Sequence, residues 1–156
     1  MKRIHAFSAV VLTLAAVATA LPETASADGP FRFFAITPCR VYDSRPGPIA
    51  KGLHTLRVQG VCGVPVGAKA VALNVTIVGP SGPGYLSMWP VGVSEPLVAT
   101  LNFVAGEPAL ANGAIAPLGP DSGGADDLSY RIAIPSQPSG TSNIVFDVTG
   151  YFATVP

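Results

Sequence analysis

Alternating apolar and polar positions mark three segments of the chain as strands. The two-residue period is clearest in residues 70–78, where one side of an extended chain would hold Val71, Leu73, Val75 and Ile77. Residues 129–134 and 143–149 repeat this period, and Gly150 then predicts a bulge or a bend before the strand continues. Successive side chains of a strand point to opposite faces, so one face of each segment is predicted to lie in a core.

Shorter apolar runs, separated by clusters of glycine and proline, are also typical of strands. They cover residues 33–36, 40–43, 54–58, 84–89, 98–103 and 114–118. After the first 27 residues, glycine or proline interrupts every stretch of the chain before three helical turns could form. About nine strands without crossover helices predict an all-β fold, an antiparallel β-sandwich similar to a jelly roll. A closed β-barrel is the alternative.

The first 27 residues are predicted to be a signal peptide. Two basic residues precede an apolar run, residues 9–20, that is short for a membrane span. Small-x-small cleavage sites end at Ala20 and Ala27, and we favour cleavage after Ala27. Residues 28–156 would then form one secreted domain, and an uncleaved membrane anchor is the alternative.

Composition narrows the classes of partner. Only 12% of the 156 residues are charged, against about 25% in typical soluble domains, and the formal net charge is zero. No basic run is present in residues 28–156, so the electrostatic attraction that nucleic-acid binding needs is missing. Binding to anionic membranes is disfavoured for the same reason, and no membrane insertion of the mature chain is expected.

Two cysteines, Cys39 and Cys62, are predicted to form a disulfide, because exported thiols meet an oxidising compartment. Closing the loop between them should contribute roughly 3 kcal/mol by restricting the unfolded chain. A metal site is the alternative, but no histidine or further cysteine lies at ligand spacing from either residue. No cofactor is expected.

Short motifs follow one another in a fixed order along residues 33–153. They are TPCRVYDSR (37–45), CGVP (62–65), AVALNVT (70–76), GYL (84–86), WP (89–90), LNF (101–103) and DVTGYF (147–152). This pattern resembles an uncharacterised β-rich domain that recurs in secreted bacterial proteins, often in tandem. The resemblance implies export and a β fold. This chain has one copy, which disfavours a role as a spacer between other domains.

Catalytic chemistry has few candidate groups. Nucleophilic catalysis needs a base that titrates near neutrality, and only His54 remains after processing. We expect His54 at the surface or at a strand edge. A small polysaccharide-active hydrolase needs two carboxylates across a cleft, for which Asp43 and Asp147 are the candidates. We predict no catalytic residue.

The same carboxylates are better explained as structural groups. Asp43 and Asp147 lie in predicted strands, and Arg40 or Arg45 could supply a bidentate partner, so we predict a structural ion pair among these four residues.

A loop rich in aspartate is a weak candidate for calcium binding. Asp121, Asp126 and Asp127 offer carboxylates to a Ca²⁺ ion, but the spacing of an EF-hand is missing. A solvated hairpin loop is the favoured interpretation, and no metal site is assigned.

Tyr85 and Trp89 are candidate ligand contacts. They lie four residues apart, so a regular strand would place both on one side, where with Tyr151 they are candidates for stacking on a sugar. Core packing is the favoured interpretation. Asn74 begins a glycosylation acceptor pattern in the middle of a core strand, and we expect no glycan there.

These observations favour a secreted, non-catalytic structural or adhesive module that acts at or outside the cell surface. A surface with little charge has little self-repulsion, so the partner could be a second copy of the chain or surface glycans. For residues 31–36 a place in their own sheet is favoured, and extension of a neighbour's sheet is the alternative. A carbohydrate-binding module is the second function and a hydrolase the third.

Overall fold

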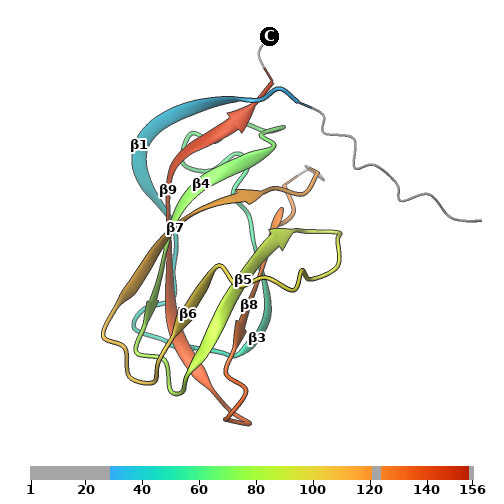
Figure 1. Ribbon diagram of the computed structural model, residues 1–156. Helices are drawn as coiled ribbons and strands as arrows, with labels where there is room; N and C mark the ends of the chain where they lie inside the picture. Colours follow the sequence, from blue (N-terminus) through green and yellow to red (C-terminus); the bar gives the residue numbers. More distant parts are fainter. Residues whose placement is uncertain (1–28, 121–123, 155–156) are drawn as a thin grey trace, which may run out of the picture.

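The computed structural model describes residues 29–120 and 124–154, and these form a β-sandwich of nine strands (Figure 1). Every strand pairing is antiparallel, so the predicted fold class is confirmed. The strands are β1 (Arg32–Asp43), β2 (Ile49–Ala50), β3 (Gly52–Leu56), β4 (Ala70–Val78), β5 (Gly84–Pro90), β6 (Leu101–Phe103), β7 (Leu110–Pro117), β8 (Leu128–Ala133) and β9 (Thr141–Ala153).

Strand order makes the sandwich a jelly roll. One sheet has the order β1-β9-β4-β7, with β2 also paired to β9, and the other has the order β3-β8-β5-β6. The pairs are nested: β5 with β6, β4 with β7, β3 with β8 and β1 with β9. Two open sheets are formed by the described strands, so the alternative of a closed barrel is wrong.

The core lies between the sheets, where the alternating positions place it. Val71, Val75 and Ile77 of β4 are fully buried, which confirms the predicted inward face of this strand. At the centre, the ring of Phe146 from β9 meets Tyr130 from β8 edge-on, with 5.0 Å between ring centroids. Aromatic pairs in this geometry add to the burial of their apolar area.

Gly150 marks a bulge in β9, as predicted from the sequence. Ala72 of β4 faces Gly150, and the next residue, Leu73, faces Val148. Thr149 is therefore left out of the pairing, and its hydroxyl instead donates a hydrogen bond to the carbonyl of Ala72 over 3.3 Å. Through the bulge a strand of 13 residues keeps contact with both neighbours while it bends.

Other strand boundaries differ from the predictions. The separate runs at residues 33–36 and 40–43 belong to one strand, β1, which stays paired with β9 through two register shifts. Residues 32–36 thus join their own sheet, as favoured from the sequence. The short strand β2 was not predicted.

The predicted signal peptide, residues 1–27, lies outside the described residues. Within the described part of the chain, no helix is long and apolar enough to cross a membrane.

Candidate functional site

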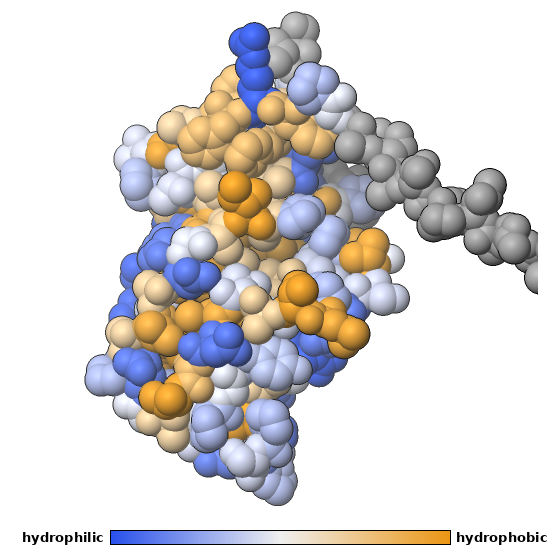
Figure 2. All heavy atoms as spheres, viewed as in Figure 1, coloured by the Kyte–Doolittle hydropathy of each residue, from blue (hydrophilic) through white to orange (hydrophobic). Residues whose placement is uncertain are grey.

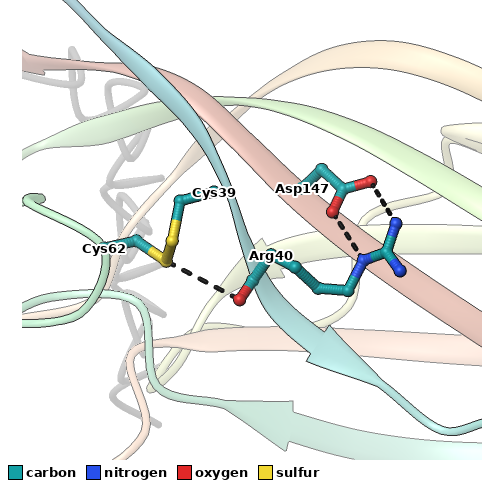
Figure 3. The surroundings of a disulfide bond; sticks show 4 residues. All are labelled: Cys39, Arg40, Cys62 and Asp147. Atoms are coloured by element: carbon teal, nitrogen blue, oxygen red, sulfur yellow. Dashed lines mark hydrogen bonds and ion pairs between the residues drawn. A yellow bond between two sulfur atoms is a disulfide. The ribbon is translucent and has the colours of Figure 1, made fainter.

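The disulfide between Cys39 and Cys62 is present, as predicted. It joins β1 to the connection between β3 and β4, with 5.7 Å between the two Cα atoms. Cys62 Sγ also lies 3.6 Å from the backbone carbonyl oxygen of Arg40 (Figure 3). The bond fixes the middle of β1, and it leaves no free cysteine among the described residues.

Arg40 connects two carboxylates on the surface of the first sheet. Its Nε donates to Asp147 Oδ1 over 2.8 Å (Figure 3). Its Nη1 donates to Asp43 Oδ2 over 3.0 Å. Arg45 binds Asp43 from the other side, with 2.6 Å between Nη2 and Oδ2. The four residues named from the sequence therefore meet in one cluster, which ties β1 to β9.

The Arg40 cluster is poorly suited to acid catalysis. Hydrogen bonds from Arg45, and then the positive charges of Arg45 and Arg40, hold the pKa of Asp43 well below its usual range. A general acid of a glycoside hydrolase needs a raised pKa instead. The depression beside the cluster, lined also by Asn74 and Thr149, thus offers anchored charges rather than a proton donor.

Asp127 has a structural role. It is almost completely buried, and its two carboxylate oxygens accept hydrogen bonds from the backbone amides of Val58 and Gln59 over 3.0 and 2.7 Å. Burial raises its pKa, and these two hydrogen bonds oppose the rise. Asp126 instead accepts from the hydroxyl of Thr55.

The weak calcium candidate does not assemble from the residues that can be placed. Asp126 and Asp127 bind different partners, and Asp121 lies outside the described residues. No group of three possible metal ligands occurs in residues 29–120 and 124–154.

Tyr85 and Trp89 of β5, the candidate ligand contacts, lie on the same face as predicted, but they differ in exposure. Trp89 shares the outward face of β5 with Tyr85 and Ser87, but only 5% of its surface is exposed. An open aromatic platform made of Tyr85 and Trp89 is therefore not formed. Tyr85 is half-buried and lines a pocket.

This pocket has a volume of about 500 Å³ and lies on the outer face of the second sheet. Its floor consists of outward side chains from three strands: Tyr85 and Ser87 from β5, Asn102 from β6 and Arg131 from β8. Its wall is residues 95–99 of the connection between β5 and β6. We call it the β5–β6 pocket. Its volume falls within the roughly 300–1,000 Å³ usual for small-molecule sites.

Hydrogen bonds fix the wall of the pocket to the sheets. Ser87 Oγ donates to the carbonyl of Val98 over 2.8 Å, and the backbone amide of Thr100 donates to Leu86 O over 2.7 Å. From the other sheet, Asn112 Nδ2 donates to Thr100 O over 2.7 Å. A wall held at several points keeps its shape without a ligand, which lowers the entropic cost of binding.

One ion pair spans the pocket. Arg131 Nε lies 2.6 Å from Glu95 Oε2, so floor and wall are joined by opposite charges. Both side chains remain about one-third exposed, which leaves polar atoms of the pair within reach of a ligand. The lining contains no other charged residue, and the pocket as a whole is neutral.

Exposed apolar side chains lie on the connection that forms the wall of the pocket. Leu97 is fully exposed, and Val93 and Val98 of the same connection are also largely exposed. Figure 2 shows hydrophobic side chains on the face over which this connection runs. Exposed apolar groups beside a cavity with a few polar side chains are typical of contact surfaces.

His54 has an internal role. Its ring stacks on Tyr130 with 5.1 Å between centroids, and Nε2 lies 2.8 Å from the carbonyl oxygen of Ala50. His54 belongs to β3, which is an edge strand of its sheet, in agreement with the prediction of a surface or strand-edge position.

Apart from Tyr85, the residues of the pocket were missed from the sequence, among them the polar residues Ser87, Glu95, Asn102 and Arg131. A signal for two of them was present, because Asn102 and Arg131 are the polar positions between buried neighbours in their strands. Glu95 had no such signal, since it lies in a connection without periodicity.

Comparison with known protein families and with curated proteins finds no match to this chain. Two of the sequence motifs nevertheless meet in the pocket. GYL and LNF pair with each other across β5 and β6, and their central residues, Tyr85 and Asn102, face one another in register. The interpretation of the site therefore depends on its geometry.

Proposed function

We propose that this chain is a secreted, non-catalytic adhesive module that acts by contact at or outside the cell surface. The observation that carries the proposal is the β5–β6 pocket, a fixed and neutral cavity with exposed apolar groups on its wall. Binding surfaces combine apolar contact with a few placed polar groups in this way.

The placement of the ionisable groups supports a role without catalysis. Asp43 and Asp147 are held by arginines, and Asp127 accepts two backbone hydrogen bonds. Glu95 of the pocket is paired with Arg131. Each of these four carboxylates has a structural partner, and none of the four is paired with a histidine or a hydroxyl nucleophile in the manner of a catalytic dyad.

Export is part of this proposal. The disulfide is compatible with an oxidising compartment, and the predicted leader supplies a route. We include in the proposal that the chain is one copy of the β-rich domain that its motifs resemble. The segments TPCRVYDSR and DVTGYF hold the Arg40 cluster in the folded chain, and a frame of this kind suits a domain that is reused in different proteins.

Adhesion is tested with the fluorescently labelled mature chain on the surface of intact producing cells. We expect saturable binding that the unlabelled chain displaces, and loss of this binding in Leu97→Ser with Val98→Ser. Leu53→Ser is the matched control, because Leu53 is equally apolar and more than half exposed but lies on β3. Binding that does not saturate, or that the control variant loses to the same extent, would contradict the proposal.

Self-association is the other form of contact that a surface with little charge permits. Sedimentation of the mature chain over a range of concentrations separates it from adhesion to a different molecule. A monomer at all concentrations would restrict the proposal to foreign partners.

A further inference from the structure

We propose that the β5–β6 pocket binds one neutral pyranose unit of a glycan. This inference rests on the proposed adhesive function and names the chemical class of its ligand. It follows from the unpaired polar atoms, the charge balance and the aromatic ring of the pocket, which are taken in turn below.

Two polar side chains on the floor have no hydrogen-bond partner within the described chain. Tyr85 and Asn102 face one another in register on β5 and β6, and neither the phenol hydroxyl nor the side-chain amide is engaged. A hydroxyl and an amide together donate and accept hydrogen bonds. A ligand with several hydroxyl groups can use both capacities.

The ion pair adds polar groups without adding net charge. The ion pair joins Arg131 Nε to Glu95 Oε2, and among the described residues the terminal guanidinium nitrogens and Glu95 Oε1 have no further partner. A guanidinium and a carboxylate are planar and bind two neighbouring groups at once. Adjacent hydroxyls of a sugar fit this geometry. An anionic ligand would find the charge of Arg131 already balanced.

An aromatic ring and an apolar wall complete the match. The ring of Tyr85 combines an apolar body with a polar tip, and residues 96–99 opposite it are apolar. A pyranose has the complementary pattern, with C–H groups on its faces and hydroxyls around its rim. Because the hydrogen bonds of Ser87 and Thr100 already fix the wall, the ligand meets a preformed site.

The test is titration of the mature protein with glucose, galactose, mannose and N-acetylglucosamine, with short oligomers of each, and with glucuronic acid as an anionic counterpart. Calorimetry and saturation-transfer NMR supply the affinities. We expect saturable binding of at least one neutral sugar. Glucuronic acid should bind at least about tenfold more weakly, because its carboxylate would lose hydration without meeting an unpaired cation.

Variants locate the binding. Tyr85→Ala and Asn102→Ala should each weaken the affinity by about tenfold or more, because each removes a group that contacts the ligand. Asn74→Ala is the matched control, an amide on the outer face of the opposite sheet, and should leave the affinity unchanged. Circular dichroism and thermal unfolding establish that each variant is folded.

Three outcomes would overturn the inference: no saturable binding of any neutral sugar, unchanged binding in both pocket variants, or a preference for glucuronic acid. These outcomes are separable from failure of the adhesive function. If the wild type binds cells but no sugar, this inference alone is contradicted. If the folded wild type shows no specific cell binding, the proposed adhesive function is contradicted.

Discussion

The phenyl ring of Phe33 lies against Gly150, so closely that a Cβ atom at position 150 would come within 2.3 Å of the ring. The same atom would lie 2.8 Å from the carbonyl oxygen of Phe34. Glycine at the β9 bulge thus lets β1 and its aromatic side chain approach the sheet. The first strand is held by this contact as well as by its hydrogen bonds.

We expect Gly150→Ala to lower the free energy of unfolding by about 2 kcal/mol, because inserting a methyl group into a packed site forces the ring and backbone apart. Gly113→Ala is the matched control in the same sheet, since a Cβ there has open space around it. It should change stability by less than about 0.5 kcal/mol. Urea unfolding measures both, and equal effects would show that β1 does not need the close approach.

Reduction of the disulfide should destabilise the domain by about 3 kcal/mol, because Cys39 and Cys62 are separated by 23 residues and the reduced unfolded chain gains the freedom of that loop. The double variant Cys39→Ala, Cys62→Ala should show a similar loss without reductant. Urea midpoints with and without dithiothreitol measure the first effect. An unchanged urea midpoint of the wild type in dithiothreitol would contradict the prediction.

Asp43 should make stability depend on acid pH. Its pKa is lowered in the folded state by Arg45 and Arg40, so its stabilising contribution is present above the unfolded-state pKa of about 3.9. The contribution is lost as the pH falls from there toward the lower folded value. The stability difference between wild type and Asp43→Asn should therefore be largest near neutral pH and shrink between about pH 4 and pH 2.

Urea midpoints at pH 7, 5, 3 and 2 check this dependence. Glu107→Gln is the control, because the side chain of Glu107 has no ion-pair partner in the described chain. A difference between wild type and Asp43→Asn that stays constant over this range would mean that the arginines do not stabilise the ionised carboxylate.

Asp127→Ala should lower the free energy of unfolding by about 3 kcal/mol, since it leaves the buried amides of Val58 and Gln59 without acceptors. Asp126→Ala, one residue earlier, removes only an exposed hydrogen bond to Thr55 and should lower it by less than about 1 kcal/mol. Chemical denaturation of the two variants gives the comparison. The reverse order of effects would contradict the structural role of Asp127.

The fold was more predictable than the candidate site. The alternation in residues 70–78 correctly predicted the bounds and the inward face of β4, and Gly150 correctly predicted the bulge in β9. The sequence did not reveal that residues 33–36 and 40–43 belong to one strand, because Pro38 interrupts the apolar pattern between them. Pairing with β9 nevertheless resumes beyond Pro38. Local periodicity reports which face of a strand is apolar, and pairing partners decide where the strand ends.

The pocket could not be predicted because periodicity says nothing of what covers an outer face. Trp89 occupies an outward position and is still buried, whereas Tyr85 on the same face remains partly open. Glu95 reaches Arg131 only through the path of a connection that has no repeating pattern. Such contacts depend on three-dimensional arrangement, and a single sequence contains no local signal for them.

Nested strand pairing has a consequence for how this protein is made. The innermost pair, β5 and β6, lies close together in sequence, whereas β1 and β9 belong to opposite ends of the domain. Distant contacts slow folding because a long loop must close before they form. β9 is synthesised after the other strands of the domain, so the aromatic strand β1 has no partner until β9 has been made, and the sandwich is completed only then.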